Sequence, residues 1–329
     1  MAILVCGGAG YIGSHTVYKL IEEGREVIII DNLQSGHLDA VHPKAKFYEG
    51  DIRNADLLDK IFTENKIEAI VHFAANSLVG ESMVKPLVYY NNNVYGMQIL
   101  LESMVRNNVN NIVFSSTAAV YGEPKRIPIM EDDHTEPTNT YGETKLAMEK
   151  MMKWCNKAYG INYVALRYFN AAGSLGDGSI GEDHNPESHL IPLILQVPLK
   201  KREAITVYGT DYATEDGTCV RDYIHVLDLA QAHIKAVDYL TTNNKSNIFN
   251  LGNGVGFSVK EMIDATKEVV GEDINTIYGE RRAGDPAKLI ASSEKARTVL
   301  GWKPEYTDVK SIIKDAWTFH QAKPNGFEK

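Results

Sequence analysis

The sequence predicts an α/β fold in which a doubly wound parallel sheet is followed by a smaller C-terminal α+β lobe. Two observations support this prediction. Short apolar, β-branched runs alternate with longer helical patterns through the first half, and the composition shifts towards Gly, Asp, Asn and Pro near residue 171. Near-continuous apolar strands that alternate with helices are typical of a parallel sheet covered on both faces. We therefore expect one domain at 1–170 and a second at 171–329.

The strands expected in the first domain are five short apolar runs. In chain order they are Ile3–Cys6, Val27–Ile30, Ala69–Phe73, Ile112–Ser115 and Tyr163–Arg167. The stretch AAGSLGDGSIGEDHNPESH then predicts a loop-rich connection into the smaller lobe. A helical pattern at 225–240 is expected to pack back on the first domain.

The composition restricts the class of protein. With 44% hydrophobic and 23% charged residues, it is that of an ordinary globular protein. A net charge of −9 disfavours binding to nucleic acid, which requires a basic surface. The longest apolar runs are strand-sized, and the N-terminus lacks the pattern of a secretory signal, so neither a membrane span nor export is expected.

Cysteine and histidine patterns give no metal motif. The three cysteines lack metal-ligand spacing and indicate reduced thiols in a cytoplasmic protein. The ten histidines form neither an HExxH motif nor a recognisable His/Asp cluster. We interpret them as satisfied or surface side chains, and no metal is expected.

The first expected strand leads into a glycine turn, GGAGYIG, and then into a helical pattern. Gly7, Gly10 and Gly13 allow the backbone to turn tightly and to approach a pyrophosphate, which then meets the N–H groups of the helix. Asp31, at the end of the second strand, can accept hydrogen bonds from ribose hydroxyls and would repel a 2′-phosphate. The pattern predicts a Rossmann-like domain that prefers NAD to NADP. A later glycine run, at 249–262, is interpreted as a turn before a capping box of Ser258 and Glu261.

The pattern Tyr-x-x-x-Lys occurs three times, at 121–125, 141–145 and 306–310. The first contains Pro124, which prevents a helix from aligning the two side chains. The third is far from the glycine turn. Tyr141 and Lys145 begin a stretch of helix formers that ends at Gly160, so their side chains are expected to be neighbours. Because Thr117 ends the preceding strand, the three residues are predicted to meet near the dinucleotide.

The motifs GGAGYIG, SSTAAVYG, YGETK and RYFNAAG resemble those of the extended short-chain dehydrogenase/reductase family. NNNVYG, GEDHNPESHLIP, EDGTCVRDYIHVLDLA and RRAGD narrow the resemblance to its nucleotide-sugar 4-epimerases, over nearly the whole chain. The resemblance implies a UDP-hexose substrate, a resident NAD cofactor and interconversion of UDP-galactose and UDP-glucose. It also implies a homodimer paired through roughly 92–107 and 141–158.

The resemblance assigns roles to residues of this sequence. Tyr141 is the implied general acid/base, Lys145 holds the nicotinamide ribose, and Thr117 binds the sugar oxygen, with the phenolate favoured by neighbouring positive charge. The implied cofactor-binding residues are Gly7, Gly10, Tyr11, Ile12, Gly13, Asp31, Asn32, Asp51, Ile52, Phe73, Ala74, Ala75, Asn92, Tyr141, Lys145 and Phe169. The implied substrate-binding residues are Thr117, Asn170, His189, Leu190, Val207, Tyr208, Arg221, Arg282, Asp285 and Leu289.

Other activities remain to be weighed. Dehydratases that resemble this fold carry an acidic pair just after the threonine, where this chain has Ala118 and Ala119, which favours epimerisation. Decarboxylases of the same superfamily and a redox-sensing NAD-binding regulator are further alternatives, and intact Thr117, Tyr141 and Lys145 argue against the regulator. Leu289 suggests additional activity on N-acetylhexosamine forms. Ser77 stands where related epimerases often have lysine, so weaker retention of NAD is expected.

Overall fold

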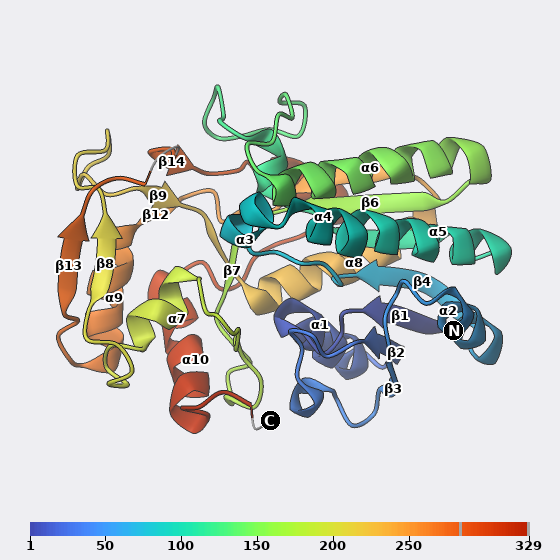
Figure 1. The fold of residues 1–329 in the computed structure, drawn as a ribbon, viewed down its shortest axis with the longest axis horizontal. Coiled ribbons are helices and arrows are strands. Elements are labelled where there is room, and N and C mark those ends of the chain that lie inside the picture. The colour runs from blue at the N-terminus through green and yellow to red at the C-terminus, as the bar shows by residue number, and fades with distance from the viewer. Residues whose placement is uncertain (283–284, 328–329) are drawn as a thin grey trace.

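Seven parallel strands form the main sheet in the order β11-β6-β5-β4-β1-β2-β3 (Figure 1). The computed structural model describes residues 1–282 and 285–327. The strands of this sheet are β1 (Ala2–Cys6), β2 (Glu26–Asp31), β3 (Lys46–Glu49), β4 (Ile67–His72), β5 (Asn111–Ser115), β6 (Asn162–Arg167) and β11 (Asn247–Asn250). All five expected strands are confirmed, whereas β3 and β11, at the two edges, were not predicted.

Successive residues of the central strands enter two different hydrophobic cores, because side chains alternate between the faces of a strand. In β1, Leu4 and Cys6 join one core, whereas Ile3 and Val5 join the other. The first core contains side chains of α2 (Ala55–Glu64), α5 (Gly96–Arg106) and α6 (Thr140–Tyr159). The second contains those of α1 (Tyr11–Glu22) and α8 (Val226–Asn243). Helices therefore cover both faces, and the predicted doubly wound class is confirmed.

The smaller lobe lies beside the carboxyl ends of the strands, at the left of Figure 1. Its core joins α7 (Leu190–Leu195), α9 (Val259–Val270) and α10 (Val309–Ala322) to β8 (Ile205–Tyr208), which pairs in parallel with β13 (Thr276–Gly279). Its remaining strands are β7 (Asn170–Ala172) with β10 (Tyr223–His225), and β12 (Phe257–Ser258), β9 (Val220–Arg221) and β14 (Lys288–Leu289) in one sheet. Two elements that follow residue 170 in sequence belong to the main sheet and its helical layers: β11 is an edge strand of the sheet, and α8 packs on one of its faces.

Short helices connect the main elements. They are α3 (Val79–Val84), α4 (Pro86–Tyr89), the π-helices at Tyr90–Tyr95 and Ala296–Leu300, and the 3₁₀ turns at Leu38–Ala40 and Ala118–Tyr121. The expected capping box at the start of α9 is confirmed, since the side chains of Ser258 and Glu261 each bond the other's backbone N–H. No described helix combines the length and the apolar character that crossing a membrane requires.

Three histidines are fully buried between the sheet and its helices: His15, His72 and His233. Burial lowers their pKa values to about 4, 3 and 4, respectively, because the charged imidazolium is desolvated. Neither ring nitrogen of His72 has a hydrogen-bonding partner. The interpretation that histidines are satisfied or on the surface is therefore wrong for His72.

These histidines predict a loss of stability in acid. Below about pH 6.5 the unfolded chain binds protons that the folded chain takes up only near pH 4, so the unfolding free energy falls as the pH falls. Each such histidine contributes at most about 1.4 kcal/mol per pH unit. The ring of His72 lies beside that of Phe114. His72→Phe is expected to reduce the slope of the unfolding free energy against pH by at most about 1.4 kcal/mol per pH unit. Urea denaturation between about pH 6.5 and about pH 5 measures this slope.

His134→Asn is the matched control, because the side chain of His134 is 72% exposed. It should leave the slope unchanged. Equal slopes in wild type and His72→Phe would mean that His72 is already protonated in the folded protein.

Candidate active site

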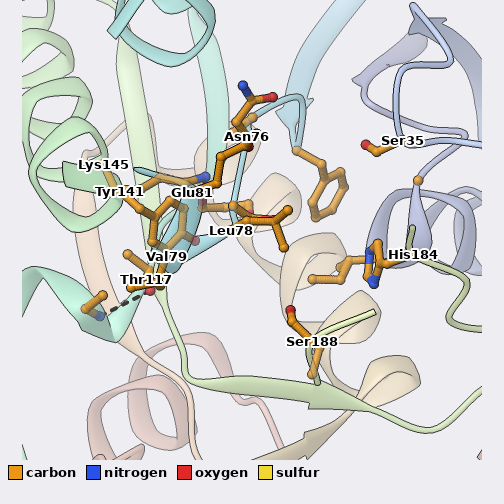
Figure 2. Close-up of a pocket in the computed structure, with 18 of the residues that line it drawn as sticks. Ser35, Asn76, Leu78, Val79, Glu81, Thr117, Tyr141, Lys145, His184 and Ser188 are labelled. Atoms are coloured by element: carbon orange, nitrogen blue, oxygen red, sulfur yellow. Dashed lines mark hydrogen bonds between the residues drawn. The ribbon is translucent and has the colours of Figure 1, made fainter. Parts of the chain in front are cut away.

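A cavity of about 1030 Å³ opens at the carboxyl ends of the strands, between the sheet and the smaller lobe (Figure 2). Its walls come from the loops after β1, β2, β4 and β5, from the start of α6, and from two parts of the second half, the segment 182–189 and the group of Arg282, Asp285, Pro286 and Leu289. In open α/β sheets, ligands bind at this edge, where the strand order reverses. Here the reversal lies at β1, which pairs with β2 on one side and β4 on the other.

The glycine loop brings bare backbone to this cavity. Gly7 has a φ of +82°, and a Cβ there would lie 2.7 Å from the backbone nitrogen of Ala74. A Cβ at Gly13 would lie 2.0 Å from the carbonyl oxygen of Gly7. No side chain caps the N-terminus of α1, which begins after Gly10. Its first N–H groups therefore remain available to an anion, as a dinucleotide pyrophosphate requires.

Two carboxylates, those of Asp31 and Asp51, line the cavity beside the glycine loop. Asp31 ends β2, and its oxygens accept hydrogen bonds from the backbone nitrogens of Ala9 and Leu33, both at 2.9 Å. Burial nevertheless raises the pKa of Asp31. Asp51 accepts from Asn32 at 3.0 Å and pairs with Arg53, which lowers the pKa of Asp51 to about 2. The loop and Asp31 thus fit a dinucleotide with a free ribose diol.

Tyr141, Lys145 and Thr117 point into the same part of the cavity (Figure 2). Helix α6 places the first two, because Asn139 caps its N-terminus by accepting from the backbone of Gly142 at 2.8 Å. The Nζ atom of Lys145 lies 5.8 Å from the centre of the Tyr141 ring. It also donates to the carbonyl oxygen of Ser115 at 2.8 Å, which fixes the ammonium at the end of β5.

Burial determines the charge state of this pair in the protein alone. It raises the pKa of Tyr141 to about 12, although hydrogen bonding with Thr117 acts to lower it. Burial also lowers the pKa of Lys145 to about 7. The expected phenolate is therefore not favoured by Lys145 by itself, because desolvation outweighs the attraction. A further positive charge in the cavity, such as an oxidised nicotinamide, is needed to stabilise it.

The other two Tyr-x-x-x-Lys pairs do not line the cavity. Tyr121 is buried, donates to Asn250 at 2.7 Å and accepts from Arg167 at 2.8 Å, so its role is structural. Tyr306 stacks on His225, with ring centres 4.0 Å apart. Of the three tyrosines, only Tyr141 is in a position to reach a ligand.

The predicted cofactor residues all line the cavity. Among the predicted substrate residues, six line it: Thr117, Asn170, His189, Arg282, Asp285 and Leu289. The other four do not: Leu190, Val207, Tyr208 and Arg221. Two residues of the RRAGD motif, 283 and 284, lie outside the described residues.

The four residues make contacts other than with the cavity. Val207 is buried in the core of the smaller lobe, and Leu190 packs against the same core. The guanidinium of Arg282 lies over the ring of Tyr208, 4.1 Å from its centre. Arg221 is paired with the carboxylate of Asp285, so its charge is already compensated.

Sequence reasoning found only part of two stretches of the wall: it named Phe73, Ala74, Ala75 and Ser77 in the first and His189 in the second, and missed their neighbours. The first is the loop after β4, whose Asn76, Leu78 and Glu81 surround the cavity (Figure 2); its position at the carboxyl edge of the sheet could have indicated it. Ser77, in the same loop, is exposed and also lines the cavity. The second is the segment 182–189.

In that segment Glu182, His184, Glu187 and His189 lie close together. Burial acts to lower the pKa values of the two histidines, but the carboxylates outweigh it and raise them to about 9 for His184 and about 10 for His189. The expectation that histidines form no cluster is wrong for these two. The reason is that Glu-x-His, which occurs twice in the eight loop residues 182–189, matches no helical metal motif.

Comparison with known proteins places the chain in a family. Residues 3–252 match the model of the NAD dependent epimerase/dehydratase family. The chain belongs to this family. It is 58% identical to the UDP-glucose 4-epimerase of Halalkalibacterium halodurans, over 99% of this chain and 98% of that protein.

Solved structures of the family superpose closely. A crystal structure of a UDP-glucose 4-epimerase, 57% identical, matches with a TM-score of 0.99 and covers 100% of both chains. The UDP-glucose 4-epimerase of Bifidobacterium longum, solved in complex with NAD⁺ and UDP, is 39% identical with a TM-score of 0.93, over 99% of this chain and 100% of that one.

Asp31 is expected to set the cofactor preference. Asp31→Ala removes the acceptor for the ribose hydroxyls and the repulsion of a 2′-phosphate. Loss of a hydrogen bond to a charged group corresponds to about 10- to 100-fold weaker NAD binding. Binding of NADP should weaken less or improve, so the preference for NAD over NADP becomes smaller. Calorimetric titration of nucleotide-stripped protein measures both affinities.

Asp39→Ala is the control, since Asp39 is an exposed acid in the loop after β2 that does not line the cavity. It should change neither affinity. A wild type that binds both dinucleotides equally would refute the assignment of Asp31.

Proposed function

We propose that the protein interconverts UDP-glucose and UDP-galactose, a step of galactose metabolism, by inverting carbon 4 of the hexose through a 4-keto sugar. NAD is the resident cofactor. The observation that carries the proposal is the convergence of Tyr141, Lys145 and Thr117 in one cavity with the bare glycine loop and Asp31. The relatives named as UDP-glucose 4-epimerases cover the chain from end to end and support it.

The residues of the chain divide the chemistry between them. When bound, NAD supplies a reversible hydride acceptor for carbon 4. Tyr141 removes the proton of the 4-hydroxyl and later returns one to the 4-keto oxygen, as a general base and then an acid. Lys145, held by the Ser115 carbonyl, stabilises the phenolate and reaches the nicotinamide ribose. Thr117 orients the sugar oxygen. Inversion requires the keto sugar to turn within the cavity before the hydride returns to its opposite face.

Residues of the second half are proposed to hold the UDP group. Arg282 and Asp285 reach the cavity and suit a diphosphate and a ribose hydroxyl, respectively. Arg221 would contribute once Asp285 exchanges its ion pair for the nucleotide. Asn170 and His189 line the adjoining wall. We retain Leu190, Val207 and Tyr208 as proposed substrate residues that act indirectly, because they help to build the lobe that holds the nucleotide.

We also propose a cytoplasmic homodimer. The π-helix at Tyr90–Tyr95, α5 and α6 lie side by side on one face (Figure 1). That face exposes large apolar side chains, including Tyr95, Trp154 and Tyr159. Exposed apolar groups gathered on packed helices support burial against a second copy of the chain.

Tyr141→Phe tests the proposed function directly. Without the phenolic proton acceptor, turnover of UDP-galactose should fall by about 10²- to 10⁴-fold, the usual contribution of a general acid/base. Binding of UDP should change little, because its proposed contacts lie in the other half of the cavity. A coupled assay for UDP-glucose measures turnover, and calorimetry measures UDP binding.

Tyr278→Phe is the matched control, because Tyr278 is 60% exposed on β13 and does not line the cavity. Near-normal turnover of Tyr141→Phe, with Tyr278→Phe unchanged, would show that another residue moves the proton.

Leu289 is proposed to limit the size of the sugar that the cavity accepts. Because leucine is smaller than tyrosine, we propose additional activity on UDP-N-acetylglucosamine. Its side chain lines the cavity and packs against the cluster that contains Ala118 and Tyr121. Leu289→Tyr should selectively lose the N-acetyl substrate, because a ring crowds the 2-N-acetyl group as the sugar turns. Activity on UDP-galactose should persist.

Leu289→Met conserves volume and should keep both activities. If both activities fall together in Leu289→Tyr, Leu289 serves packing and does not select the sugar.

A further inference from the structure

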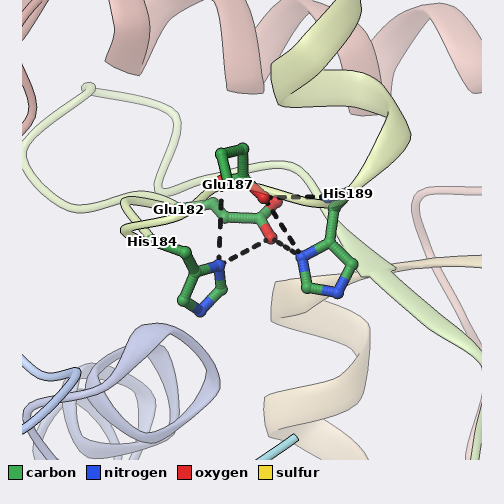
Figure 3. Close-up of side chains that lie close together, drawn as sticks. All are labelled: Glu182, His184, Glu187 and His189. Atoms are coloured by element: carbon green, nitrogen blue, oxygen red, sulfur yellow. Dashed lines mark hydrogen bonds and ion pairs between the residues drawn. The ribbon is translucent and has the colours of Figure 1, made fainter. Parts of the chain in front are cut away.

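The segment 182–189, between β7 and α7, places four side chains around one point: Glu182, His184, Glu187 and His189 (Figure 3). One nitrogen or oxygen from each lies within 4.8 Å of the others. The carboxylates are 5% and 9% exposed, so neither is a solvated surface acid. Nothing in the proposed epimerisation uses this cluster as a unit.

The two distances at His184 are close to the edges of a tetrahedral metal site. With metal–ligand bonds of about 2.0–2.2 Å, ligand atoms of a tetrahedral ion stand about 3.3–3.6 Å apart. The Nδ1 atom of His184 lies 3.3 Å from Glu182 and 3.7 Å from Glu187. The Nδ1 atom of His189 lies 3.5 Å from Oε1 of Glu187, the other oxygen of that carboxylate. Its 2.6 Å contact with Oε1 of Glu182 is shorter than such an edge, so the His189 ring must move slightly to share an ion.

The unsatisfied atoms point to a missing partner. Glu182 Oε1, His184 Nδ1 and His189 Nδ1 are all buried and make no hydrogen bond of normal geometry, although the two nitrogens lie 3.3 and 2.6 Å from Glu182 Oε1. If the cluster were held only by ion pairs, the ring N–H groups would point at the carboxylates. Buried polar atoms that converge without well-aligned hydrogen bonds are unusual, because ion pairing alone replaces only part of the hydration that they lose.

Glu187 is oriented independently of the histidine rings. Its Oε1 atom accepts from the backbone nitrogens of Ser188 at 2.7 Å and His189 at 2.8 Å. Its Oε2 atom is directed to His184. Such outer hydrogen bonds fix the direction of a ligating carboxylate in metal sites.

We propose that Glu182, His184, Glu187 and His189 bind one divalent transition-metal ion, with Zn²⁺ as the expected occupant. Two imidazole nitrogens with two carboxylate oxygens suit zinc, whereas magnesium and calcium prefer oxygen ligands alone. Two carboxylates balance the charge of the ion. This replaces the expectation from the sequence that no metal binds.

The site is structural, because four protein ligands fill a tetrahedral shell and leave no position for a substrate. Its effect is on the cavity wall, where the rings of His184 and His189 and the neighbouring Ser188 face the interior. An ion that joins Glu182 to His189 fixes the segment in the form that contacts the substrate. Removing the ion should therefore raise KM for the UDP-sugar more than it lowers kcat.

The first experiment measures metal content. Full-length protein without a histidine tag, purified from zinc-supplemented medium without chelator, should contain about one zinc per chain by mass spectrometry. Glu182→Gln keeps the shape but removes one anionic ligand, and should lower the zinc affinity by more than about 10²-fold. His134→Ala should bind zinc normally, because it removes only an exposed histidine that lies 3.7 Å from Glu136. Wild type and Glu182→Gln with equally little zinc would overturn the proposal.

The second experiment needs no variant, so it stands even if Glu182→Gln fails to fold. Chelator-treated wild type is titrated with Co²⁺, which should give the visible bands of a tetrahedral ion, and with Zn²⁺, which should raise Tm and restore KM. Added zinc should displace the cobalt spectrum. If neither metal changes the spectrum or Tm, the four side chains form only an ion-pair cluster and the proposal is wrong. Both readouts are independent of whether the enzyme is active.

Discussion

The close approach of two loops at the carboxyl end of β1 is the constraint on which the cavity depends. The carbonyl oxygen of Cys6 accepts from the backbone nitrogens of both Phe73 and Ala74, at 2.8 and 3.0 Å. This ties the loop after β1 to the loop after β4, at the point where the strand order reverses. Gly7 must lack a side chain there, because a Cβ would collide with Ala74. The dinucleotide loop, the cavity floor and the loop at 76–81 all follow from that contact.

A second buried interaction positions helix α6 on this floor. Glu149 of α6 and Arg167 of β6 form a bidentate pair whose side chains are each 4% exposed. Ser116 donates to the same carboxylate at 2.5 Å, and Tyr121 accepts from Arg167. Fully satisfied buried networks specify one packing arrangement, even where an apolar core would be as stable. The network lies one turn beyond Lys145, so it orients the start of α6 against β5.

The sequence predicts those features whose signals are local. Buried strands show as apolar runs, and the glycine spacing and YGETK specify their own geometry. Strand β3 could not be predicted, because its four residues, KFYE, are half-exposed at an edge and lack an apolar run. The short β11 joins the sheet only through its pairing with β6, 80 or so residues earlier. The cluster at 182–189 depends on how an irregular loop folds, and the pKa of Lys145 depends on burial by distant segments.

The edge position of β11 has a consequence for the order of folding during synthesis. Until residues 247–250 leave the ribosome, β6 has an unpaired edge, and for most of that time α8, at 226–243, is also still missing from the sheet face that it covers. At about 5–20 residues per second, this interval lasts on the order of 4–16 seconds. Open strand edges are templates for pairing between chains. The nascent enzyme is therefore most exposed to aggregation after its cofactor loop has been made and before its sheet is closed, an interval in which chaperones have the greatest effect.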